Sequence, residues 1–350
     1  MKPACSSDLD RLTAQLHARR SRMAEGSKLN ELCRSRSLSE LGRNVLPRRE
    51  EFTRTTEFQR QLIRDLIQEL SGCCSHLDGA SRPFIRWLQT RFQVENVKVF
   101  LRGILNRTPP DELRPHLVDL PAELALDFAG LTGEMTLPAF ITHLPAGPPR
   151  KFLENFVSRQ NDSPSGFLLE AALDAGYFEE LLRLAGRLPG DEREILEPSV
   201  TQEINMFQFL LVARGKFHFG LSPEVLSPLR VTRGEWLHRL QSAPDILTAA
   251  QIADGVVIDE LPAQLRSGDG QPAPDLATIE RLAWQRYLRL ANRAFRRSHL
   301  GIAAVAGYFG VRRIEIANLI TLSEGIRLGV TAEKIRARLV PQTVVEVAHV

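Results

Sequence analysis

An internal repeat constrains the fold of this chain more than any other feature of its sequence. Three segments, 92–118, 204–230 and 314–340, align with one another without a gap. A glycine and a leucine fourteen positions later recur in every copy: Gly103 and Leu117, Gly215 and Leu229, Gly325 and Leu339. The glycines are 112 and 110 residues apart, so we predict three similar domains of ordinary size, 1–120, 121–231 and 232–350.

A long buried helix is predicted before each glycine. Apolar residues recur eleven, nine, six and three positions back, which is the spacing of one helical stripe. One side-chain amide stands inside that stripe, seven positions before the glycine, as Asn96, Gln208 and Asn318. A buried amide is costly unless its donors and acceptors find partners. It is either a binding residue or a structural pin that sets helix register, and we favour the pin.

The glycine suits the C-terminal cap of this helix, because a residue without Cβ adopts positive φ at little cost. Arg102 and Arg214 precede two of the glycines and suit the negative end of the helix dipole. A short helix is expected next, with an apolar residue ten positions beyond the glycine: Leu113, Val225 and Ile335. Strand-like alternation is scarce elsewhere, so we predict an all-α fold built of helical bundles.

Composition narrows the class of function. With 45 basic and 42 acidic residues the formal net charge is +3, which argues against a dedicated nucleic-acid binder. Arginine clusters at 19–22, 293–297 and 312–313 are interpreted as solvated helix faces, with docking to an acidic partner as the alternative. No apolar run approaches the roughly 20 residues of a membrane span, and we expect no transmembrane segment.

The sequence carries no recognisable catalytic motif. It has no Walker phosphate loop, dinucleotide fingerprint or zinc-protease motif, so we expect neither an enzyme nor a bound cofactor. The four cysteines, Cys5, Cys33, Cys73 and Cys74, lack the two-residue spacing of a zinc site. A metal at Cys73, Cys74 and His76 would need ligands from elsewhere, and reduced thiols are the favoured interpretation.

The three copies resemble one known family. The run Glu315-Ile-Ala-Asn318-Leu-Ile and the stretch that follows Gly325 are similar to the C subunit of bacterial and archaeal V/A-type ATPases, a component of the central stalk. The eukaryotic counterpart is the d subunit of the vacuolar ATPase. Residues 96–103 resemble the first motif of the family and residues 203–216 the second, so the resemblance covers nearly the whole chain.

The third copy departs from the family pattern. Ile320, Glu324 and Ile326 replace an arginine after the amide, an arginine before the glycine and a lysine after it, and Gln208 replaces an asparagine in the second copy. These changes put in doubt any single contact carried over from the family. The residues that the resemblance suggests for partner docking are Arg102, Arg214, Lys216 and Glu324.

The resemblance implies a funnel of three helical domains related by a pseudo-threefold axis around a central cavity. Such a protein would couple the shaft of the ATP-handling head, at one mouth, to the cytoplasmic loops of the membrane rotor ring, at the other, for ion transport. It would be non-catalytic, a monomer within a hetero-complex, and peripheral on the cytoplasmic face of a membrane. The alternative is a free-standing helical adaptor that kept a related repeat.

Overall fold

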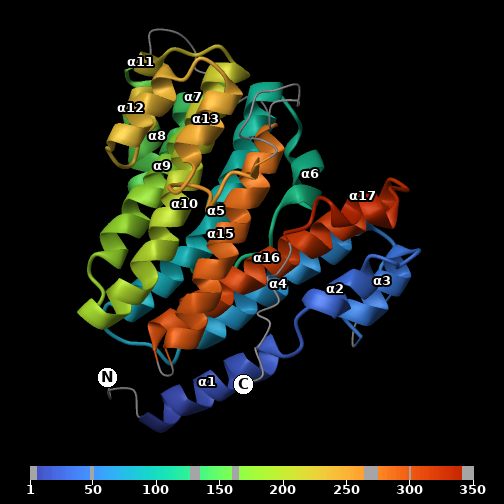
Figure 1. Ribbon diagram of the computed structural model, residues 1–350. Helices are drawn as coiled ribbons and strands as arrows, with labels where there is room; N and C mark the ends of the chain where they lie inside the picture. Colours follow the sequence, from blue (N-terminus) through green and yellow to red (C-terminus); the bar gives the residue numbers. More distant parts are fainter. Residues whose placement is uncertain are drawn as a thin grey trace. The chain divides into compact units, whose positions relative to one another are not determined.

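The computed structural model describes residues 6–47, 51–126, 135–159, 165–263, 275–298 and 301–340 (Figure 1). Every element in these ranges is helical, and the one β feature is an isolated bridge between Asp254 and Ile258, so the predicted all-α class is confirmed. None of the described helices is long and apolar enough to cross a membrane. Cys5 lies outside the described residues.

Eight helices have ten residues or more: α1 (Ser6–Arg20), α4 (Thr55–Cys74), α5 (Ser81–Asn106), α8 (Pro148–Val157), α9 (Gly166–Ala185), α10 (Gly190–Phe217), α15 (Leu276–Arg297) and α16 (Ile302–Arg327), counted over the described residues. The shorter elements are α2 (Gly26–Leu32), α3 (Leu38–Val45), α6 (Pro110–Leu113), η1 (Arg114–His116), α7 (Leu137–His143), α11 (Pro223–Leu226), η2 (Ser227–Leu229), α12 (Glu235–Ser242), α13 (Ile246–Ala253) and α17 (Ala332–Arg336). The predicted long helices are therefore α5, α10 and α16, and the predicted short helices are α6, α11 and α17.

The chain divides into two compact units. Unit 1 comprises residues 1–78, 194–199 and 281–350, and unit 2 comprises residues 79–193 and 200–280. Unit 1 therefore joins the beginning of the chain to its end. The three long helices are distributed unequally, because α16 belongs to unit 1 whereas α5 and most of α10 belong to unit 2.

The core of unit 1 is built around α16. This helix lies beside α4 and also contacts α1 and α3 (Figure 1). Two glycines let α16 approach α15 closely: a Cβ on Gly307 would lie 2.4 Å from the backbone nitrogen of Phe295, and one on Gly310 would lie 2.9 Å from the Cβ of Ala291. Since neither of these neighbouring atoms belongs to the end of a flexible side chain, α15 and α16 are packed almost backbone to backbone.

The core of unit 2 is built around α9, which packs against both α5 and α8 (Figure 1). A Cβ on Gly176 would lie 2.7 Å from the Cα of Pro149, so only glycine allows α8 to lie this close. On its other side, α9 receives a hydrogen bond of 3.0 Å from Trp87 Nε1 to the carbonyl of Tyr177. The hydrogen bond from Trp87 holds α9 against α5, and the close packing of Gly176 on Pro149 holds it against α8.

The repeated glycines do not cap the long helices. The helices α5, α10 and α16 continue for two or three residues beyond Gly103, Gly215 and Gly325, and the C-cap prediction is wrong. Each glycine instead makes room for an apolar side chain of the short helix that follows. A Cβ in its place would lie 2.3 Å from Leu113, 2.7 Å from Leu226 or 2.5 Å from Ile335. In the second copy this residue is Leu226 rather than the expected Val225, because α11 begins eight residues after Gly215, whereas α6 and α17 begin seven residues after Gly103 and Gly325.

Candidate functional site

Each of the three repeated amides makes a pair of hydrogen bonds to one residue further along the chain. Asn96 Nδ2 donates to the carbonyl of Val118 and Asn96 Oδ1 accepts from the N–H of Val118, both at 2.8 Å. Asn318 bonds Val340 in the same way, at 3.2 and 3.0 Å. Gln208 accepts from the N–H of Thr232 at 2.9 Å and donates to its hydroxyl oxygen at 2.8 Å. We call each pair an amide staple.

Each amide staple fastens a long helix to the chain that follows the short helix. The bonded residues are 22, 24 and 22 positions apart in the three copies. The side chains of Asn96, Gln208 and Asn318 are 2%, 0% and 3% exposed, so water cannot replace the lost bonds if the amide is removed. The extra methylene of Gln208 accompanies the longer connection in the second copy.

The regular spacing of the leucines brings them next to these staples. Leu229 and Leu339 are buried, whereas Leu117 is half-buried. Leu117 and Leu339 directly precede Val118 and Val340, the residues that the amides bond. The leucine thus anchors the same stretch of backbone that the amide holds.

The residue before each glycine links its long helix to another helix. Arg102 makes two bonds to Glu170, at 2.6 and 2.7 Å, and Arg214 bonds Glu280 at 2.7 Å, both within unit 2. Glu324 accepts a bond of 2.7 Å from Gln59 Nε2 within unit 1. We call these contacts the three helix links.

The helix links follow one rule. Their partners are each the fifth residue of a helix: Gln59 in α4, Glu170 in α9 and Glu280 in α15. These are the helices that precede the long helices α5, α10 and α16 in the chain. Thus α5 is linked to α9, α10 to α15, and α16 to α4.

The links differ in charge. The bond to Glu170 raises the pKa of the Arg102 guanidinium, in spite of partial burial, and thus keeps this ion pair charged. Glu324 stands where the other two copies have an arginine, so its link to Gln59 joins a carboxylate to a neutral amide. Burial acts to raise the pKa of the Glu324 carboxyl, but the bonds from Arg327 and Gln59 outweigh it and lower the pKa.

A second polar cluster joins α5 to α9 in unit 2. Asp174 receives Arg91 at 2.9 Å and Lys98 at 2.7 Å, and both cations also contact Glu95. Burial acts to raise the pKa of Glu95, but Arg91 and Lys98 prevail and hold it below its ordinary value. The Arg91 guanidinium also lies over the ring of Tyr177, 5.5 Å from the centroid. Both charge and packing therefore fix this pair of helices.

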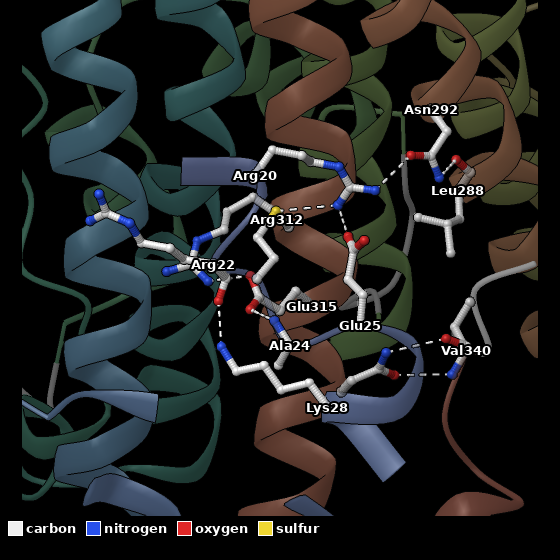
Figure 2. A network of polar contacts seen from close by, with 12 residues as sticks. Arg20, Arg22, Ala24, Glu25, Lys28, Leu288, Asn292, Arg312, Glu315 and Val340 are labelled. Atoms are coloured by element: carbon white, nitrogen blue, oxygen red, sulfur yellow. Dashed lines mark hydrogen bonds and ion pairs between the residues drawn. The ribbon is translucent and has the colours of Figure 1, made fainter. Parts of the chain in front are cut away.

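Arg20 and Arg312 do not lie on solvated faces, which corrects the sequence-based interpretation for these two residues, whereas Arg22 is exposed. Figure 2 shows Arg20 bonded to Glu25 and, at 2.9 Å, to Asn292, while Arg312 bonds Glu315. The other oxygen of Glu315 accepts the backbone N–H of Ala24. Burial lowers the pKa of Arg20 to about 10. This network ties the segment between α1 and α2 to α16.

Other members of these clusters differ in their surroundings. Arg313 lies over the rings of Trp284, Tyr287 and Phe309, at 5.6–5.8 Å from their centroids. Arg293, Arg296 and Arg297, by contrast, are exposed, as a solvated face requires. Sequence reasoning failed for Arg20 because Glu25 lies beyond the end of α1, and for Arg312 because a second acid, Glu69, lies on α4.

The four residues suggested for partner docking all have contacts inside the chain. Arg102, Arg214 and Glu324 form the helix links, and the Lys216 ammonium donates to the backbone carbonyls of Gln241, at 2.7 Å, and Ala243. The partner residues Gln59, Glu170 and Glu280 were not identified from the sequence. Two of them could have been found by extending the alignment of the repeated glycines, because Glu170 lies 45 positions before Gly215 and Glu280 lies 45 positions before Gly325.

Among the described residues, no group of three or more His, Cys, Asp or Glu side chains is arranged to hold a metal ion. Cys33, Cys73 and Cys74 carry thiol groups and are not joined in disulfides. An open groove of about 890 Å³ in unit 2 is lined by a mixture of acids and bases, including Lys151, Glu179 and Arg183. These contacts define a repeated helical scaffold whose conspicuous polar residues bind its own elements together.

Comparison with known proteins identifies the family. The family model described as ATP synthase (C/AC39) subunit matches residues 12–338. The chain belongs to this family. It is 22% identical over 319 residues to the C subunit of an A-type ATP synthase from Methanosphaera stadtmanae, covering 87% of this chain and 80% of that protein.

Two further relatives carry the same name. The C subunit of the A-type ATP synthase from Methanothermobacter thermautotrophicus is 22% identical over 321 residues, which is 90% of this chain and 83% of that protein. The one from Methanocaldococcus jannaschii is 22% identical over 347 residues, which is 94% of this chain and 85% of that protein. The resemblance seen in the sequence motifs is therefore confirmed over nearly the whole chain.

Proposed function

We propose that this chain is the non-catalytic connector that couples the central shaft of a V/A-type rotary ATPase to its membrane rotor ring. Membership of the ATP synthase (C/AC39) subunit family supports a place in such a complex. The observation that carries the proposal is the order of the helix links, which is cyclic for the three domains proposed below, because the first copy is linked to the second and the second to the third. The last of them, between Glu324 and Gln59, returns from the third copy to the first.

A cyclic order suits a part that transmits torque. If every copy is bonded to the next, a tangential force on one copy is shared by all three, and no copy is a free end. The proposed architecture is a funnel of three pseudo-threefold domains, 1–120, 121–231 and 232–350, around a central cavity. The amide staples support this proposal, because three equivalent buried bonds give three domains the same rigid core.

The proposed partners are the shaft subunits of the head and the cytoplasmic loops of the rotor ring. The protein acts as a monomer within this hetero-complex, peripheral on the cytoplasmic face of the membrane, and takes part in ion transport without catalysing a reaction itself. Rotation would pass from the shaft through the funnel to the ring. The runner-up is a free-standing helical adaptor.

Fractionation of host membranes separates the two functions. Antibody against this chain should detect it in the membrane pellet, co-purifying with the ATP-hydrolysing subunits after mild detergent extraction. High salt or a chelator should release it without detergent, since it is held by polar contacts to other subunits. Recovery of the chain in the supernatant, with no ATPase subunit bound, would identify an adaptor and reject the coupling role.

A further inference from the structure

The two units of the chain differ in formal charge. Unit 1 carries 26 basic and 17 acidic residues, a net charge of +9, whereas unit 2 carries 19 basic and 25 acidic residues, a net charge of −6. The count for unit 1 includes Glu194 and Glu197, the acids that α10 contributes to it. The small net charge of the whole chain thus hides a strongly basic unit, and such a unit is attracted to an extended anionic surface.

One stretch of unit 1 contains basic residues without any acid. Residues 281–314 hold eight arginines and no acidic residue. Because each residue turns a helix by about 100°, five of these arginines lie on α15 within an arc of about 100°. We call these five the arginine face: Arg286, Arg289, Arg293, Arg296 and Arg297. Every exposed position of α15 from residue 281 to its end belongs to this face.

Other helices of unit 1 cover the remaining sides of α15. On the side opposite the arginine face, α16 approaches so closely that a Cβ on Gly307 would meet the backbone of Phe295. The end of α1 also lies beside α15, where the rings of His17 and Phe295 are 4.8 Å apart and Arg20 bonds Asn292 at 2.9 Å. These contacts fix the rotation of α15 about its axis and turn the arginine face outward.

The last three arginines of the arginine face are not neutralised within the part of the chain that the structure describes. There, the side chains of Arg293, Arg296 and Arg297 make neither a hydrogen bond nor an ion pair. Two acids of the network in Figure 2, Glu25 and Glu315, are already bound to arginines of α1 and α16. Three guanidinium groups on one face are therefore available to an anionic partner.

We propose that the arginine face of α15 binds the phosphate groups of anionic lipids at a membrane surface. Such surfaces attract clusters of about four to eight cations on an amphipathic helix, and the arginine face has five. Arginine suits this partner, because a guanidinium group can bind a phosphate through two parallel hydrogen bonds. A protein partner would need an apolar centre for its interface, and the exposed positions of α15 from residue 281 onward offer none.

This inference goes beyond the coupling function, because lipid is a partner that neither the shaft nor the rotor ring supplies. It rests on the proposed function only for the presence of a membrane beside the chain. Lipids diffuse within their leaflet, so contacts with their phosphates would hold unit 1 at the membrane surface without resisting rotation.

Sedimentation of the purified full-length chain with lipid vesicles tests the proposal. Vesicles of phosphatidylcholine that contain phosphatidylglycerol are compared with vesicles of phosphatidylcholine alone. Wild type should bind the anionic vesicles, not the neutral ones, and its binding should weaken as salt is added. The test variant combines Arg293→Gln, Arg296→Gln and Arg297→Gln. It should bind the anionic vesicles about a hundredfold more weakly, since each cation near the lipid surface contributes about fivefold.

The matched control removes three exposed arginines of unit 2, by Arg159→Gln, Arg187→Gln and Arg239→Gln. It changes the net charge of the chain by the same amount as the test variant and should bind like wild type. A further variant, in which lysine replaces the three arginines of the test variant, keeps their charge and should recover most of the binding. Thermal unfolding of every variant separates a loss of charge from a failure to fold.

Three results would overturn the lipid site. Wild type that binds neutral and anionic vesicles equally, or binds neither, has no such site. A test variant that binds as well as wild type, or no worse than the unit 2 control, shows that the arginine face is not where the lipid binds. Binding to host membranes stripped of the chain, without binding to vesicles of their extracted lipids, identifies a membrane protein as the partner.

The coupling function is tested apart from the lipid site. None of these vesicle results bears on it, because the vesicles contain no ATPase subunit. Conversely, if fractionation of host membranes finds no ATPase subunit with the chain, the coupling function is wrong, and the measured affinity for anionic vesicles is unchanged.

Discussion

Replacement of Asn318 by leucine tests the amide staple in the copy where both ends of the staple are buried. Asn318 is 3% exposed and its partner Val340 is 8% exposed, so water reaches neither end of the two bonds. Leucine leaves both the N–H and the carbonyl of Val340 without a partner, and each orphaned group costs about 1–3 kcal/mol. With about 2 kcal/mol for each of the two groups, and about 1–2 kcal/mol returned by the greater apolar burial of leucine, the net loss of unfolding free energy is about 2–3 kcal/mol.

Urea unfolding followed by circular dichroism measures this loss. The control is Asn155→Leu, at an exposed position of α8, which should change the unfolding free energy by less than about 0.5 kcal/mol. Asn96→Leu and Gln208→Leu should destabilise the chain in the same way if the three staples are equivalent. A change of no more than about 0.5 kcal/mol for Asn318→Leu would show that the amide is not what fastens the long helix.

Three more predictions concern packing, thiol reactivity and acid stability. Gly215→Ala should destabilise by about 1 kcal/mol in thermal unfolding because its Cβ would meet buried Leu226, whereas Gly72→Ala, in open space inside α4, should stabilise by about 0.5–1 kcal/mol. Burial raises the pKa of Cys73 to about 11, so about one thiol in a thousand is ionised at pH 8, and a thiol reagent should label it, by peptide mapping, only after unfolding. The pKa of Glu95 is lower in the folded than in the unfolded chain, so its charge adds stability above the unfolded pKa, and this contribution disappears as the pH falls through the folded pKa. Acid titration of the unfolding free energy should therefore show that Glu95→Gln is less stable than wild type at pH 7 and that the difference vanishes below the folded pKa, whereas a difference that stays constant with pH would refute this cause.

The repeat could be found in the sequence because it depends on local periodicity. The buried stripe, the amide inside it and the short helix after it all lie within 27 aligned positions, where helical spacing alone brings the residues together. The role of the repeated glycine was misinterpreted because the interpretation relied on this local pattern alone. A glycine after an arginine at the end of a stripe is typical of a helix cap, and only the position of Leu113, ten residues on, shows why a Cβ is excluded.

The helix links could not be derived from local patterns. Arg102 and Glu170 are 68 residues apart, and Arg214 and Glu280 are 66 apart, so no helical period relates them. The burial of Arg312 was missed because its acidic neighbour Glu69 comes from α4, at the other end of the chain.

ATP-driven ion uptake by stripped membrane vesicles tests the central claim most directly. Vesicles freed of this chain should hydrolyse ATP but take up no ions, and addition of the purified chain should restore uptake, because rotation of the head then reaches the membrane ring. Ion uptake that continues unchanged in vesicles without the chain would contradict a role as the mechanical connector.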